Sequence, residues 1–143
     1  IELYNAKGEK VNIYFDMKER KLVMDRTESG LIEFGKLAVP HDIEKNYTDI
    51  HQGVGNTPFR VFNSINYKND FALGTWAPLS LCEGKTYHVD IFVDKCSVEI
   101  FVDGGRIAMT NLVFPTTPYT SVKFYNKGAS SSFRNIKISE LSL

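Results

Sequence analysis

The chain has 143 residues, which suits one domain that buries about two-thirds of the surface its unfolded form would expose. Lysine plus arginine total 17 and aspartate plus glutamate total 17, so no overall field attracts nucleic acid or an anionic membrane. No apolar run approaches the roughly 20 residues of a membrane-spanning helix, and the first residues lack a signal-peptide pattern. We therefore expect a single domain over residues 1–143, with neither a nucleic-acid nor a membrane partner.

The N-terminal part predicts a β-hairpin. In residues 10–15, apolar side chains alternate with asparagine and tyrosine, which is the period of a strand with one buried face. A polar connection follows, and residues 21–25 have the pattern of the returning strand. Gly30 then suits a turn.

The centre of the chain has weaker patterns. Residues 31–57 predict loops with short strands, and residues 59–65 predict a strand buried on both sides. Pro78 disfavours a central place in a sheet for the piece that contains it. Trp76 and the tyrosines could stack on sugars, but we interpret this single tryptophan near a proline as a plug over the edge of the core.

The strongest pattern is a meander of three strands. Residues 89–93, 98–102 and 107–113 each place apolar side chains mainly at every second position. The first connection is Asp-Lys-Cys at residues 94–96, and the second is Asp-Gly-Gly at residues 103–105. Glycine tolerates the positive φ of tight hairpin turns, which suits the second connection. The three alternating runs and their short connections therefore predict a meander of two hairpins.

The C-terminal part predicts two more strands, residues 121–125 and 133–141, separated by a flexible segment. No stretch of ten or more residues keeps helical spacing without a glycine, a proline or a strand pattern. The sequence therefore predicts an all-β fold of about nine to twelve short strands, arranged as two antiparallel sheets packed face to face.

Cysteine and histidine spacing gives no sign of a metal site. Cys82 and Cys96 have neither metal-ligand spacing nor a CxxC relationship. A disulfide between them stays open, but two separate buried thiols are our preferred interpretation. His41, His51 and His88 lack zinc-binding spacing, and no glycine-rich loop leads into a helix to hold a phosphate. We expect no cofactor.

Two segments resemble a known family. Residues 25–30 read Asp-Arg-Thr-Glu-Ser-Gly, and residues 94–101 read Asp-Lys-Cys-Ser-Val-Glu-Ile-Phe, followed by a glycine-rich turn and a strand that ends in Phe114 and Pro115. Together they resemble the signature of the C-terminal β-sandwich of glycoside hydrolase family 32, which contains invertases, levanases and inulinases. The resemblance implies a concanavalin A-like sandwich, that is, a lectin-like jelly roll.

The resemblance varies along the chain. It is strong over residues 76–115 and moderate over residues 10–30, whereas residues 31–75 are longer than we expect between the two motifs. Lys95 and Cys96 stand where the family commonly has Arg or His followed by Ser.

The resemblance also implies where catalysis takes place. Family 32 enzymes carry it on a five-bladed propeller that precedes the sandwich, in Asn-Asp-Pro, Arg-Asp-Pro and Glu-Cys motifs, and this chain has none of the three. Glu83 follows Cys82, the reverse of the family order. The chain would then be an excised, non-catalytic module that braces the propeller of a secreted, periplasmic or cell-surface enzyme acting on levan, inulin or sucrose. The module could also take part in homodimer contacts.

Catalysis by a retaining glycosidase needs two carboxyl groups about 5–5.5 Å apart. The candidates by residue type are Asp25, Asp90, Asp94, Glu99 and Asp103. A structural role is favoured for all of them. The aspartates at residues 94 and 103 sit in hairpin turns, where a short carboxylate accepts hydrogen bonds from backbone amides.

Three residues are candidates for binding a ligand: Asp25, Arg26 and Glu99. A covered glutamate in mid-strand must be paired, because an isolated buried charge is too costly. Its available partners are Arg26, Arg60, Arg106 and Arg134. The pair of Glu99 and an arginine would have one of two roles. It would be a structural ion pair, which we favour, or it would bind the hydroxyls of a terminal fructose, as in related fructan-binding modules. Asp25 and Arg26 can line one pocket only if the strand bends between them.

Two functions therefore stay open, a bracing module and a lectin-like module that binds fructosyl ends. A bracing module should expose an apolar patch of several hundred Å² when separated from its propeller. A binding module should instead have a polar concave site. Catalysis by this chain itself is the least favoured function.

Overall fold

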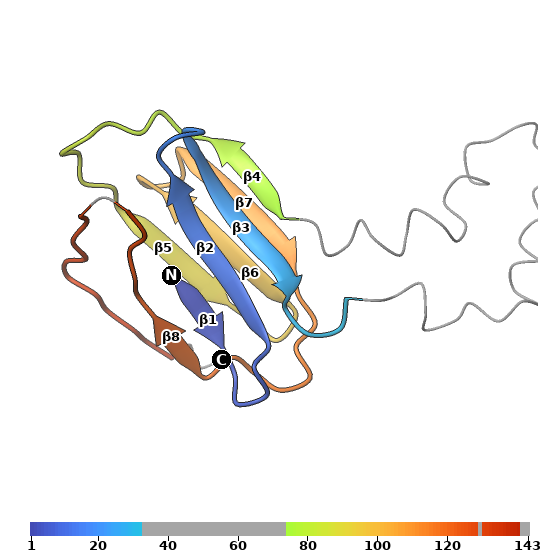
Figure 1. Ribbon diagram of the computed structural model, residues 1–143. Coiled ribbons are helices and arrows are strands. Elements are labelled where there is room, and N and C mark those ends of the chain that lie inside the picture. The colour runs from blue at the N-terminus through green and yellow to red at the C-terminus, as the bar shows by residue number, and fades with distance from the viewer. Residues whose placement is uncertain (33–73, 129, 141–143) are drawn as a thin grey trace, which may run out of the picture.

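The computed structural model describes residues 1–32, 74–128 and 130–140, and these residues form a two-layer β-sandwich (Figure 1). The first sheet has the strand order β4-β3-β2-β1-β8, and the second has the order β5-β6-β7. All pairs are antiparallel. The strands are β1 (Glu2–Tyr4), β2 (Lys10–Asp16), β3 (Lys21–Glu28), β4 (Thr75–Pro78), β5 (Val89–Val93), β6 (Ser97–Val102), β7 (Ile107–Leu112) and β8 (Ser121–Lys123).

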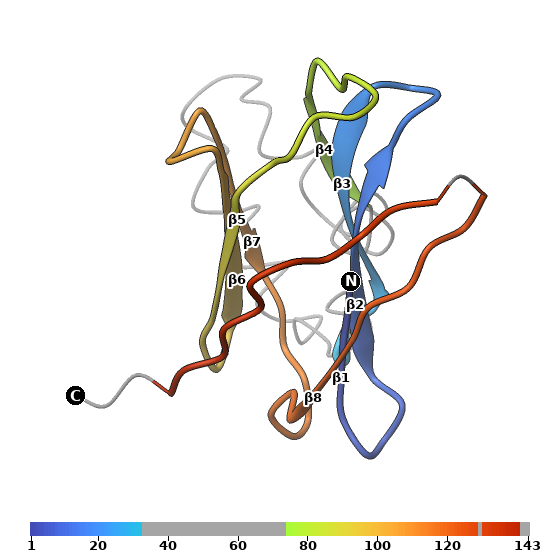
Figure 2. The same ribbon diagram turned by 90° about the vertical axis from the view of Figure 1, so that its left-hand side faces the viewer.

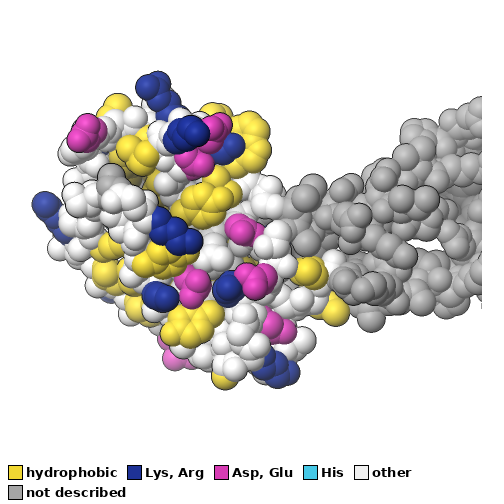
Figure 3. Space-filling model, viewed as in Figure 1, with side chains coloured by type: hydrophobic (Ala, Val, Ile, Leu, Met, Phe, Trp, Pro, Cys, Tyr) yellow, Lys and Arg dark blue, Asp and Glu magenta, His cyan; other side chains and the backbone are white. Residues whose placement is uncertain are grey.

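The two sheets lie face to face, as the view along their edges shows (Figure 2). No helix occurs in the described ranges, and the predicted all-β, two-sheet antiparallel sandwich is confirmed. The outer face of the first sheet mixes hydrophobic side chains with charges of both signs (Figure 3). Among the described residues, no helix is long and apolar enough to cross a membrane.

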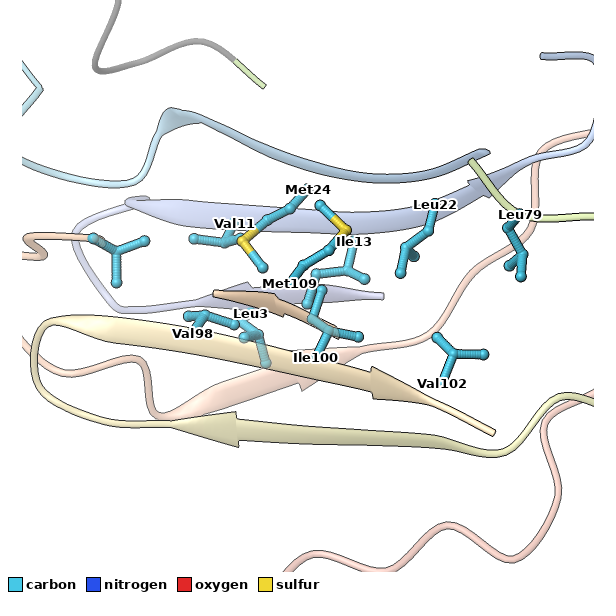
Figure 4. Close-up of a cluster of buried hydrophobic side chains, with 11 residues drawn as sticks. Leu3, Val11, Ile13, Leu22, Met24, Leu79, Val98, Ile100, Val102 and Met109 are labelled. Atoms are coloured by element: carbon cyan, nitrogen blue, oxygen red, sulfur yellow. The ribbon is translucent and has the colours of Figure 1, made fainter. Parts of the chain in front are cut away.

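The core fills the space between the sheets (Figure 4). It takes alternate residues from each strand, as the period of two requires. The first sheet and the residue after β4 supply Leu3, Val11, Ile13, Leu22, Met24 and Leu79, and the second sheet and the residue after β7 supply Val98, Ile100, Val102, Met109 and Val113. Each such side chain contributes about 1.5–3 kcal/mol when fully buried, so this cluster is the main source of the sandwich's stability.

Most of the predicted strands are confirmed. The hairpin β2–β3 and the meander β5–β6–β7 lie where the alternating patterns placed them. The piece that contains Pro78 is β4, which lies at the edge of the sheet that the described residues form, as expected. Strand β1 was not predicted, because its three residues bury only Leu3 and are too short to show a period.

Some predictions are wrong. Residues 133–140 form no strand, and Ile136 and Ile138 are 54% and 75% exposed. Their alternation is real, but a strand also needs a partner edge. The two cysteines are free as preferred, yet both are exposed, because neither lies on a core-facing strand position. The predicted strand at residues 59–65 lies outside the described residues.

Trp76 is also not the plug that was predicted. It is 61% exposed on the edge strand β4, directly opposite Val23 of β3. The neighbouring β4 residue Ala77 pairs with the core residue Leu22. Because side chains alternate between the two faces of a strand, Trp76 points away from the core.

Candidate functional site

The three predicted ligand residues lie on two sheets. Asp25 and Arg26 are in β3, and Glu99 is in the middle of β6. The pairs Lys10↔Glu28 and Asn12↔Asp25 frame a β-bulge in β3. The strand therefore bends beside Asp25 and Arg26, which was the condition for the two side chains to share a pocket.

Their side chains nevertheless have separate partners. Asp25 Oδ1 accepts hydrogen bonds from the backbone N of Thr27 at 3.0 Å and from its Oγ1 at 2.7 Å. Arg26 Nη1 donates to the carbonyl oxygen of Leu112, at the end of β7, at 2.8 Å. Burial lowers the pKa of the Arg26 guanidinium. Arg26 thus ties the first sheet to the second, while the Asp25 carboxylate stays with its own strand.

Glu99 is half-buried on the outer face of the second sheet, between Phe92 of β5 and Thr110 of β7. Among the described residues it makes no ion pair, so Arg106 and Arg134 are not its partners. Arg60, another predicted partner, lies outside them. Ligand binding by Asp25, Arg26 and Glu99 stays a prediction.

The two segments that carried the family resemblance meet in a joint between the sheets. Gly30 has φ +124°, and a Cβ there would lie 2.5 Å from the Phe114 carbonyl oxygen and 2.6 Å from Pro115 Cα. Leu31 N donates to that same carbonyl at 2.8 Å. The Tyr119 hydroxyl donates to the Ser29 carbonyl oxygen at 2.5 Å. These contacts give the signature residues a structural role.

The turn aspartates also have the structural role expected of them. Asp94 Oδ1 accepts from Lys95 N at 2.7 Å, and Asp103 Oδ1 accepts from His88 N at 3.0 Å. The hydrogen bond from His88 and the charge of Lys85, 3.6 Å away, lower the pKa of Asp103 in spite of the opposing effect of burial.

The second sheet has an apolar outer face. We call it the phenylalanine face, and it consists of Phe92, Phe101, Ala108 and Leu112, with Asp90, Ser97, Glu99 and Thr110 between them. Phe92 and Phe101 meet edge to face, with ring centroids 5.8 Å apart. Phe92 is 47% exposed and Leu112 is 51% exposed. Exposed apolar side chains that cluster in this way are typical of contact surfaces.

An open groove of about 220 Å³ lies beside this sheet, lined by Val93, Asp94, Lys95, Pro115, Pro118 and Tyr119. Its lining includes one carboxylate, and Asp94 is already bonded to its own turn. A glycosidase needs two carboxyl groups facing each other, so this groove does not have the groups for glycoside hydrolysis. Within the described residues no cluster of His, Cys, Asp or Glu could hold a metal ion.

Fold and site together define a class: a β-sandwich whose signature segments join its two sheets and whose second sheet exposes an apolar face. The family model for the C-terminal part of family 32 glycosyl hydrolases matches residues 1–140. The chain therefore belongs to this family, as the two motifs predicted.

The comparisons with individual proteins agree with the family. The chain is 28% identical over 95 residues to the levanbiose-producing levanase of Bacillus subtilis (strain 168), a match that spans 66% of this chain and 17% of that enzyme. It also resembles the crystal structure of exo-inulinase from Aspergillus awamori, with a TM-score of 0.52 and 21% identity, over 82% of this chain and 17% of the inulinase. The inulinase shows the shared fold, and both proteins are much longer than this chain.

Proposed function

We propose that this chain is the non-catalytic C-terminal module of a fructan- or sucrose-hydrolysing enzyme of family 32, and that it braces the catalytic propeller of the same protein. The levanase and the inulinase support levan or inulin as the substrate of the whole enzyme, which would act outside the cytoplasm. The observation that carries the bracing role is the phenylalanine face.

The phenylalanine face suits a protein partner. Phenylalanine, leucine and alanine side chains have no hydrogen-bonding group, so they gain from contact with another apolar surface and not from contact with sugar hydroxyls. Phe92 and Leu112 are about half exposed, so completing their burial contributes about 1 kcal/mol each. Contacts between domains of one chain bury about 600–1,500 Å², an area that the outer face of a three-stranded sheet can supply together with its flanking loops.

The test uses the full-length enzyme that carries this module. We expect Phe92→Asp combined with Leu112→Asp to split its thermal unfolding into two transitions and to lower the temperature at which hydrolysis of levan or inulin is lost. The 143-residue chain with the same changes should unfold almost as the unchanged chain does, because both side chains are on its surface.

The matched control is Met17→Asp, which places the same charge at a side chain that is 53% exposed in the connection between β2 and β3. It should leave the single transition of the full-length enzyme in place. Unfolding of the double variant that matches the control would contradict docking through the phenylalanine face.

A further inference from the structure

We propose that the outer face of the first sheet is a binding platform for a neutral polysaccharide chain, formed by Trp76, Tyr14 and Tyr125. This inference is independent of the docking surface, which lies on the opposite sheet. We call these three residues the aromatic row.

The strand register puts the aromatic row on one line. Trp76 of β4 pairs with Val23 of β3, and Val23 pairs with Tyr14 of β2. Val23 is only 8% exposed, whereas Trp76 and Tyr14 are 61% and 42% exposed on either side of it. Neighbouring strands lie about 4.8 Å apart, so the two aromatic residues are about 10 Å apart across the sheet.

Tyr125 continues the line beyond β1. Lys123 of β8 pairs with Glu2, and Glu2 pairs with Asn12, so two residues further along each strand Tyr125 comes level with Tyr14. Strand β1 begins at Glu2, short of this level. The Tyr125 hydroxyl donates to Asn12 Oδ1 at 3.1 Å, which holds its ring on the outer face.

The carboxylates of Asp16 and Asp25 lie beside Tyr14, the central residue of the aromatic row. Burial, followed by the charges of Asp25 and Asp16, raises the pKa of Tyr14. Asp16 Oδ1 accepts from Lys18 N at 3.0 Å and from Glu19 N at 2.9 Å, as Asp25 Oδ1 accepts from Thr27. These bonds fix both carboxylates and use only Oδ1, so Oδ2 stays available to accept from a hydroxyl group.

Lysines lie at both ends of the row. Lys21 Nζ is 5.2 Å from the centre of the Trp76 ring, and the Nζ atoms of Lys123 and Lys127 are 5.6 Å and 5.5 Å from the centre of the Tyr125 ring. Figure 3, which faces this sheet, shows hydrophobic side chains crossing it with basic and acidic side chains between them.

The chemistry of this face fits a neutral polyhydroxylated ligand. A sugar ring presents C–H groups that pack on an aromatic face, while its hydroxyls form hydrogen bonds with carboxylates and ammonium groups at the side. Trp and Tyr suit such a ligand because each has an apolar ring and a polar group at its end. The acidic groups Glu2, Asp16 and Asp25 balance the basic groups Lys21, Lys123 and Lys127, so the face favours neither a polyanion nor a polycation.

The length of the row indicates a chain of sugars and not a single unit. From β4 to β8 there are four strand spacings, about 20 Å in all, which one monosaccharide cannot span. This distinguishes the platform from the pocket for a terminal fructose that the sequence left open. Of the three residues considered for that pocket, Asp25 lies on this face, whereas Arg26 reaches the other sheet and Glu99 belongs to it.

The experiment is affinity electrophoresis and titration calorimetry of the 143-residue chain with levan and with inulin. We expect binding of at least one of them, with Trp76→Ala and Tyr14→Ala each weakening it about tenfold, as expected when a central aromatic contact is lost. Trp76→Tyr keeps a stacking ring and should retain most of the affinity. Free fructose at millimolar concentration should not compete.

Two controls make the result specific. Phe92→Ala removes an exposed aromatic side chain from the other sheet and should leave binding unchanged, and circular dichroism confirms that each variant folds. Raising the salt from about 0.05 M to about 0.5 M should change the affinity little, because a neutral ligand is not held by screened charges. Absence of binding to both fructans, equal loss in Phe92→Ala, or full competition by fructose would each overturn the proposal.

Discussion

Among the described glycines, Gly30 is the one whose replacement by alanine should destabilise the sandwich most. Gly30→Ala adds one methyl group at φ +124°, a backbone region that is essentially restricted to glycine. The added Cβ would lie 2.5 Å from the Phe114 carbonyl oxygen, and it must withdraw to at least 3.0 Å, a movement of 0.5 Å or more. Both atoms nearest the new carbon are backbone atoms, so no side chain can move aside to make room.

The expected loss has two parts. Backbone strain at such a φ costs about 1–3 kcal/mol. Movement of the Phe114 carbonyl also strains the 2.8 Å hydrogen bond from Leu31 N, and a group left without its partner costs about 1–3 kcal/mol more. We therefore expect the free energy of unfolding to fall by about 3–5 kcal/mol, which for a chain of this size lowers the melting temperature by about 10–15 °C.

Urea and thermal unfolding of the chain, followed by circular dichroism, measure this loss. The matched control is Gly8→Ala, since Gly8 also has a positive φ, +80°, but a Cβ there meets nothing within 4 Å. The control should lose about 1 kcal/mol from backbone strain alone. If Gly30→Ala loses no more than Gly8→Ala, the joint between residues 29–31 and 114–115 is not the constraint described above.

Three further predictions test other parts of the molecule. Burial raises the pKa of Tyr119 from 10.0 to about 12 in the folded chain, so the stability that its neutral form contributes is complete below pH 10 and is lost as the pH rises through 12. In urea titrations, the stability advantage of the wild type over Tyr119→Phe should therefore shrink over that range. An advantage that does not change with pH would contradict this. Cys82 and Cys96 are free and exposed, so both thiols should react with a thiol reagent in the native chain, and reaction only after denaturation would show the exposure to be wrong. Glu99→Ala should leave levan and inulin affinity unchanged if the aromatic row binds the chain, whereas loss of affinity would place the site on the second sheet instead.

The sequence predicted those strands in which apolar side chains alternate with polar ones over several residues. The meander β5–β6–β7 and the hairpin β2–β3 were found because each strand alternates over five or more residues. Strand β1 is too short for such a signal, and residues 133–140 have the signal but pair with no strand of the described residues. Periodicity therefore predicts which side chains could face a core, and pairing decides whether a strand forms.

The candidate sites depended on pairing and were mostly out of reach of the sequence. Gly30 and Phe114 are far apart in the chain, and only the packing of the two sheets brings them together. Trp76 and Tyr14 are likewise brought into one row by the register of β3 with both neighbouring strands. A tryptophan near a proline does not by itself show which face of a strand it occupies, which is why Trp76 was misplaced.

Strand β3 contributes to the core, to the joint between the sheets and to the outer face through different residues. Leu22 and Met24 point into the core, so Val23 and Asp25 must point outward, where they border the aromatic row. By the same alternation Arg26 points inward again, and beside the bulge it reaches the carbonyl oxygen of Leu112 on the other sheet. Because the bulge lies after the core residues, the joint between the sheets is built without disturbing either the core or the outer face. The phenylalanine face, on strands β5 to β7, is in turn free to contact another domain while the first sheet contacts a polysaccharide.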